Sequence, residues 1–128
     1  MIDFQHVDSE AAERLRDLAD RAQGLLLAAG IPAFVWQSST PRGGAAIEVD
    51  TGADEAGGVY ISWQVSQELA DQINRHLLSH QLTHPSIQYS GKIREAMRDA
   101  IITVLSASGI SAKASESDMR PLEVSISG

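Results

Sequence analysis

The stretch LLLAAGIPAFVW at residues 25–36 joins a helical pattern to a strand pattern through one glycine. Before it, apolar residues recur at helical spacing from Leu15 to Ala29, which predicts an amphipathic helix that begins near Asp8. Gly30 is expected to end that helix, because glycine adopts a left-handed conformation without a Cβ clash. After it, residues 31–38 alternate between two faces and predict a β-strand.

A second stretch, VLSASGISAKAS at residues 104–115, shows the same order of helix, glycine and strand. Its helix is expected to start near Ser90 and to end at Gly109. A Glu-Val pair follows each unit, at residues 48–49 and 123–124. An internal α-β-β repeat and an ordinary α-β-β geometry both explain this pattern. We expect the two helices to pack on the same side of one sheet.

The remaining segments complete an α+β pattern. Ser66 is expected to cap a further helix that Pro85 ends or follows. Turn residues and an acidic loop separate the other strands, which are expected at 45–49, 59–65, 110–116 and 122–127. The predicted order is α-β-β-β-α-α-β-β in a single domain over residues 1–128. We expect an antiparallel sheet of about five strands with helices on one face.

Composition excludes several classes of function. The chain has 128 residues and a mass of 13.7 kDa, which suits one ordinary core, and it contains no cysteine. Disulfides, thiolate metal sites and a cysteine nucleophile are therefore excluded, and a cytoplasmic location is expected. The net charge of −7 argues against a nucleic-acid partner, and no apolar run approaches the ~20 residues of a membrane helix.

The two glycine-centred stretches differ on one strand face. The expected inner faces match, with Ile31, Ala33 and Val35 in the first copy and Ile110, Ala112 and Ala114 in the second. On the opposite face, Phe34 and Trp36 replace Lys113 and Ser115. If helices cover one side of the sheet, Phe34, Trp36 and Tyr60 lie on its outer side. If the strand twists or a helix covers that side, these aromatic residues lie in the core instead.

Acidic residues lie close to these aromatic residues in the sequence. They are Glu48 and Asp50 at the end of the second strand and Asp54 and Glu55 in the loop that follows. Aromatic side chains are enriched at interface cores, and an acidic rim attracts a basic partner. The sequence therefore predicts a non-catalytic protein-binding module that acts on a basic protein partner. The same patch closing a homodimer is the alternative.

Two kinds of protein illustrate this prediction, an immunity-type inhibitor and a secretion-type chaperone. The α-β-β-β-α opening looks like the element order of type III secretion chaperones. The C-terminal part departs from that order, because it has an extra helix before the last strands and none after them.

The segment Asp50-Thr51-Gly52-Ala53 is similar to a motif of retroviral-type aspartic proteases. That resemblance implies that Asp50 is one half of a catalytic pair shared by two subunits. Those proteases are almost entirely β-structure, however, whereas this chain has three long helical segments. We therefore interpret the segment as a solvated turn.

Three histidines, His76, His80 and His84, follow one another at intervals of four residues. Two imidazoles at this spacing on a helix can share a metal ion, with Glu68 or Asp71 adding a carboxylate. A metal-dependent enzyme that uses His76 and His80 is thus a further alternative. Because Pro85 disfavours helical geometry at His84 and no HExxH motif is present, we expect no tightly bound metal and no cofactor.

Overall fold

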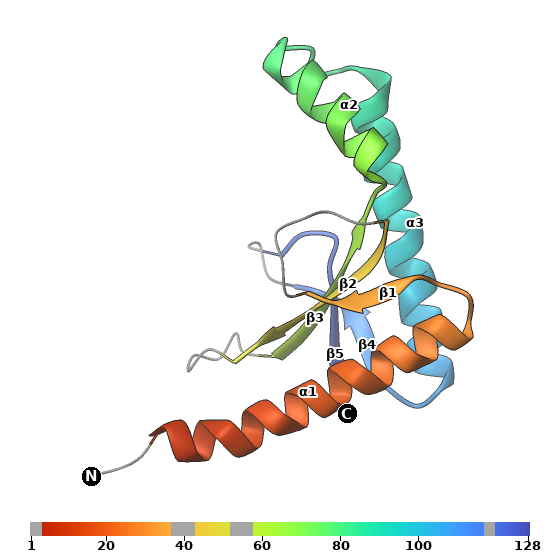
Figure 1. Cartoon of the computed structure of the whole chain (residues 1–128). Coiled ribbons are helices and arrows are strands. Elements are labelled where there is room, and N and C mark those ends of the chain that lie inside the picture. The colour runs from red at the N-terminus through yellow and green to blue at the C-terminus, as the bar shows by residue number, and fades with distance from the viewer. Residues whose placement is uncertain (1–3, 37–42, 52–57, 117–119) are drawn as a thin grey trace.

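The computed structural model describes residues 4–36, 43–51, 58–116 and 120–128. The observed element order is the predicted one (Figure 1). The elements are α1 (Phe4–Ala28), β1 (Ala33–Val35), β2 (Gly44–Asp50), β3 (Gly58–Gln64), α2 (Gln67–Leu78), α3 (Pro85–Ala107), β4 (Ser111–Ala114) and β5 (Val124–Ser127). The five strands form one sheet in the order β1-β2-β3-β5-β4.

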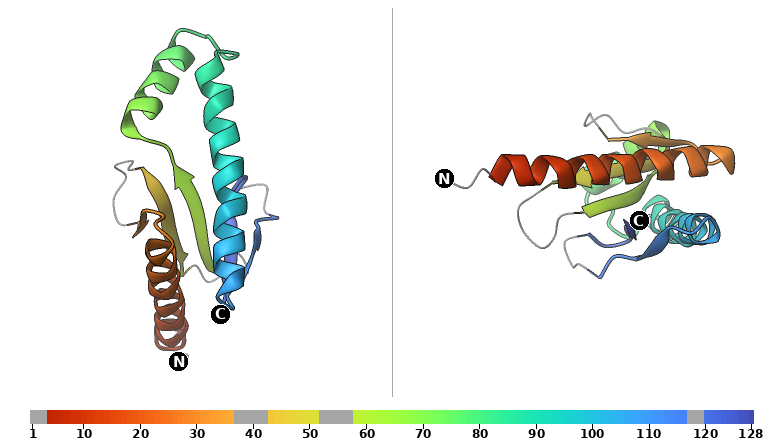
Figure 2. Two further views of the ribbon diagram at one scale, coloured as in Figure 1. Left: turned by 90° about the vertical axis from the view of Figure 1, so that its right-hand side faces the viewer. Right: turned by 90° about the horizontal axis from the view of Figure 1, so that it is seen from below.

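Helices α1 and α3 pack on the same face of this sheet and contact each other (Figure 2). Their side chains Leu26 and Ile101 join Ile47, Ile61 and Val124 of the central strands in one fully buried cluster. These strand residues occupy one register row, so they lie on one face of the sheet. The prediction of an α+β fold with helices on one face is confirmed.

Both predicted glycine stops are confirmed. Gly30 and Gly109 have φ angles of 86° and 94°, in the left-handed region. The amide of Ile31 donates to the carbonyl of Leu26 at 2.9 Å, and the amide of Ile110 donates to that of Leu105 at 3.1 Å. This six-residue closure satisfies the last helical carbonyls in the same way at both sites.

The predicted antiparallel sheet is wrong at one edge, because β1 runs parallel to β2. The carbonyl of Pro32 accepts from the amide of Ala45 at 2.8 Å, which brings the starts of both strands together. A Cβ on Gly44 would lie 2.7 Å from that carbonyl oxygen, so this close approach requires glycine. The strands β4 and β5 are antiparallel, so the two α-β-β units share a helix stop but not a strand pairing.

Helix α2 and the first half of α3 form a hairpin that projects beyond the sheet (Figures 1 and 2). The hydroxyl of Ser66 caps α2 by accepting from the amide of Leu69 at 3.2 Å, as the sequence predicts. Pro85 lies beyond α2 but also begins α3, five residues earlier than expected. No residue of α2 is fully buried. Among the described helices, none is both long enough and apolar enough to cross a membrane.

Candidate functional site

The outer face of the sheet, opposite α1 and α3, carries most of the predicted site residues. Phe34 pairs in register with Ala46 and therefore points away from the side of Ile47. The rings of Phe34 and Trp36 lie 6.3 Å apart and are both half-buried. Farther along the outer face, Glu48 is paired in register with Tyr60.

A groove of about 730 Å³ runs around the β1 edge from α1 to this outer face. The predicted residues Phe34, Trp36 and Glu48 line its sheet side. Its helix side is lined by Arg16, Ala19, Asp20 and Gln23 of α1. The groove therefore combines an aromatic wall with one amide group and with charged groups of both signs.

Among the described strands, β1 is at the end of the sheet, and Val35 of β1 lines this groove. In a parallel ladder the main-chain groups of alternate residues point to opposite sides. Pro32 and Trp36 bond to β2, so the main-chain groups of Ala33 and Val35 point to the outside. The side chain of Gln23 already donates to the carbonyl of Ala33 at 3.2 Å.

Beside the groove, Arg120 holds a cluster of carboxylates together. Its guanidinium lies 2.8 Å from Glu48, 3.1 Å from Asp50 and 3.4 Å from Glu123. The same group stacks on the ring of Tyr60 at 4.0 Å from the ring centre. Three carboxylates therefore surround one cation, and Glu48 belongs to both the cluster and the groove.

The surroundings shift two pKa values in this cluster. The hydrogen bond to Glu48 raises the pKa of Arg120 above its ordinary value, with further support from the charges of Glu48 and Glu123. Burial raises the pKa of Glu123, and Arg120 only partly opposes that shift. The guanidinium thus stays charged, and burial makes Glu123 easier to protonate than an ordinary glutamate.

The predicted site residues therefore fall into two adjoining groups. Phe34, Trp36 and Glu48 line the groove, and Asp50 and Tyr60 contact Arg120. Asp54 and Glu55 lie outside the described residues.

Sequence reasoning missed the partners that these residues meet. Arg16, Asp20 and Gln23 follow one another at helical spacing, which was the available signal for a shared polar face beside the inner stripe. Arg120 gave no such signal, because its contacts to Glu48 and Asp50 span 72 and 70 residues.

The histidines do not form the helical pair that the metal-dependent alternative requires. His80 lies beyond the end of α2 with a φ angle of 57°, so His76 and His80 do not share a helix face. Instead, the rings of His76 and His84 stack with their centres 3.4 Å apart. The Nδ1 atom of His84 accepts from the amide of Ser86 at 3.1 Å and caps α3. Within the described residues, no group of three or more His, Asp or Glu side chains is placed to hold a metal ion.

Comparison with protein families, curated proteins and solved structures found no match to this chain.

Proposed function

We propose that this chain is a non-catalytic protein-binding module that captures an extended, basic segment of a partner protein. The observation that carries the proposal is the meeting of Phe34, Trp36 and Glu48 in one groove beside β1, the end strand of the described sheet. An extended segment can add to a strand edge through main-chain hydrogen bonds, while pockets select its side chains. Here the main-chain groups of Val35 would form the hydrogen bonds with the added segment. Phe34 and Trp36 would form the pocket for one of its side chains.

The charges around the groove support a basic partner. Asp20 and Glu48 lie on its two sides, and Asp50 adjoins Glu48 on β2. Arg120 neutralises only part of this charge, since one guanidinium pairs with three carboxylates. Among the described lining residues, Arg16 is the basic one, and it favours an acidic or polar position at one end of the bound segment.

An immunity-type inhibitor and a secretion-type chaperone are the two forms of this activity that we favour. Both bind another protein without changing it chemically. A cytoplasmic location is part of the proposal and rests on the absence of cysteine. The metal-dependent alternative has less support, because His80 lies outside the helix that was expected to present it.

Intrinsic fluorescence offers a direct test. The chain has two tryptophans, so Trp63→Phe leaves Trp36 as the only reporter. We expect a decapeptide of alternating Lys and Val to change this fluorescence, and a decapeptide of alternating Glu and Val to leave it unchanged. The affinity for the basic peptide should fall as salt rises, because exposed charges are screened. Equal binding of both peptides would contradict the proposed charge preference.

Calorimetry of a second variant tests the aromatic anchor. Trp36→Ala should weaken binding of the basic peptide by about 2 kcal/mol, or roughly 30-fold, with little change in the free energy of unfolding. Tyr89→Ala removes an exposed aromatic ring that is not part of the groove lining, and it is the matched control. A loss of about 3–5 kcal/mol in stability for Trp36→Ala would instead identify Trp36 as a core residue.

A further inference from the structure

The α2–α3 hairpin carries four of the five large hydrophobic side chains that are exposed among the described residues. Five large hydrophobic side chains are exposed there and on α1. Leu77, Leu78 and Leu82 at the hairpin tip are 42%, 82% and 65% exposed, and Tyr89 on α3 is 61% exposed. Leu27 on α1, at 52%, is the fifth. Grouped apolar exposure of this kind marks an interaction surface, whereas a single exposed leucine does not.

The total exposed surface of the chain is larger than expected for a folded monomer of its mass. The chain exposes 8195 Å², whereas a folded monomer of 13.7 kDa exposes about 6,600 Å². The excess of about 1,600 Å² is twice the ~800 Å² that each partner hides in a standard interface. The hairpin, which projects beyond the sheet, contributes part of this excess.

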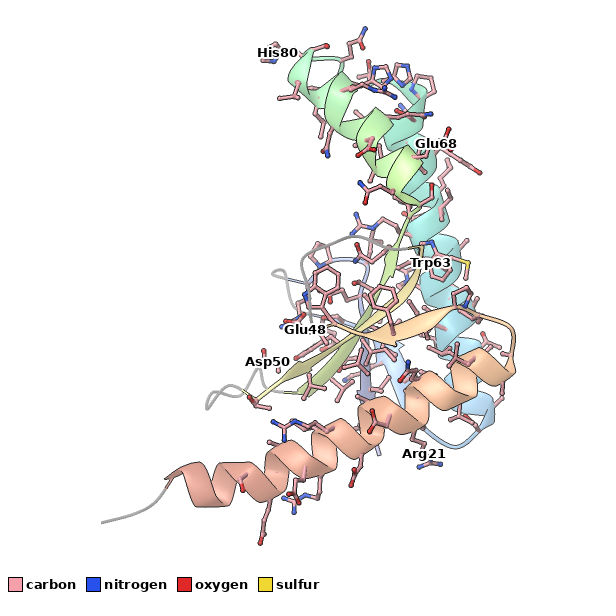
Figure 3. All side chains as sticks on the ribbon, in the orientation of Figure 1. Arg21, Glu48, Asp50, Trp63, Glu68 and His80 are labelled. Atoms are coloured by element: carbon pink, nitrogen blue, oxygen red, sulfur yellow. The ribbon has the colours of Figure 1, made fainter. Side chains whose placement is uncertain are left out.

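The base of the hairpin has a cleft that suits the side chains at its tip. The cleft has a volume of about 300 Å³ and lies between the end of β3, α2 and α3. Its apolar lining consists of Trp63, Val65, Leu69, Tyr89 and Ile93. Ser66, Glu68 and Gln72 form its polar part. In Figure 3, Trp63 and Glu68 lie at the base of the hairpin and His80 lies at its tip.

We infer that a second copy of this chain docks on the hairpin in the antiparallel direction. The tip leucines of each copy then enter the base cleft of the other, so both contacts form twice around one two-fold axis. The charges of α2 suit this arrangement, since Glu68 and Asp71 lie near the base and Arg75 and His76 lie near the tip. Antiparallel docking brings the carboxylates of one copy towards the basic residues of the other. Parallel docking places like charges together.

Light scattering after size-exclusion chromatography tests the dimer. The full chain should elute with twice the monomer mass of 13.7 kDa at micromolar concentration. Leu78→Glu combined with Leu82→Glu should give the monomer mass with an unchanged circular dichroism spectrum, because both side chains are exposed in the monomer. Leu27→Glu is the control, since it makes the same kind of change at an exposed leucine on α1. A monomeric wild type, or a dimer that survives the double change, would overturn the inference.

Cross-linking tests the direction of docking, because the chain contains no cysteine of its own. Glu68→Cys combined with Leu78→Cys places two thiols about 15 Å apart along one helix, too far for a bond within one chain. Mild oxidation should give a covalent dimer of this double variant and leave each single variant monomeric on a denaturing gel. Efficient cross-linking of Leu78→Cys alone would show that the two tips meet, which contradicts antiparallel docking.

The dimer is independent of the proposed peptide groove. The Leu78→Glu and Leu82→Glu variant should bind the Lys-Val peptide as the wild type does. The Trp36→Ala variant should remain dimeric. If the wild type is dimeric but does not bind the Lys-Val peptide, the groove proposal is wrong and the dimer stands.

Discussion

The two halves of α3 belong to one continuous helix but lie in different surroundings. The C-terminal half lies against the sheet and α1, and it buries Ile101 and Leu105 completely. The N-terminal half packs against α2, and Ser90 is its one buried residue. Two helices without a third layer leave part of each apolar stripe at the surface. Burial along α3 is therefore decided by what lies beside the helix and not by its apolar periodicity.

Truncating an apolar side chain to alanine should give the largest difference in stability between the two halves of α3. Leu105→Ala is expected to lower the free energy of unfolding by about 3 kcal/mol, since it opens a cavity among fully buried side chains. Ile93→Ala in the half-buried stripe should cost about 1 kcal/mol or less. Urea unfolding in the monomeric Leu78→Glu and Leu82→Glu background measures both values. Equal costs would show that the two halves are packed alike.

Replacing glycine by alanine should change the stability of the chain in opposite directions at Gly109 and Gly91. Gly109→Ala forces a Cβ onto a φ angle of 94° and should destabilise the chain by about 1–2 kcal/mol. Gly91→Ala lies inside the hairpin half of α3 with nothing within 4 Å of the new Cβ. Because alanine favours a helix interior, this change should stabilise the chain by about 0.5–1 kcal/mol. The midpoints of urea unfolding distinguish the two outcomes.

The start of α3 depends on a side-chain cap in place of tertiary packing. His84→Ala removes the acceptor of the Ser86 amide and should lower the opening free energy of the first turn by about 1 kcal/mol. His84→Asn keeps an acceptor at the cap and should retain most of the protection. Amide hydrogen exchange at Ser86 measures the local opening. Equal exchange rates in both variants would assign the protection to the stacked His76 ring.

The smallest expected effect is a change in stability with pH, and it depends on Glu123 beside the sheet. Because the folded-state pKa of Glu123 is raised above 4.5, its stabilising contribution is complete below that pH and is lost as pH rises through the folded pKa. Glu123→Gln remains neutral and does not lose that contribution. The stability of the variant relative to wild type should therefore increase from about pH 4 to about pH 7. A relative stability that falls over this range would mean that the ion pair with Arg120 outweighs burial.

Local patterns predicted the elements because local interactions form them. The glycine stops at Gly30 and Gly109 and the cap at Ser66 involve residues at most five positions apart. The strand faces of Ile47 and Ile61 follow from simple alternation. These features were predictable without knowledge of the tertiary structure.

The errors involve long-range geometry. The parallel pairing of β1 depends on the approach of Pro32 to Gly44, which alternation does not encode. The contacts of Arg120 with Glu48 and Asp50 join segments about seventy residues apart. His80 has a positive φ angle at a turn that helical spacing alone did not predict. In each case the deciding partner is distant in the sequence or the backbone leaves regular geometry.

The two edges of the sheet differ in their resistance to uncontrolled strand pairing. Edge strand β4 carries the exposed charge of Lys113 in a four-residue strand, which opposes the addition of another chain. Edge strand β1 has no charged residue among its three residues and borders a groove. A further strand can therefore pair with β1, whereas Lys113 opposes pairing at β4. Complexes formed through β1 are therefore expected to be finite, and Lys113→Val should favour growth into fibrils.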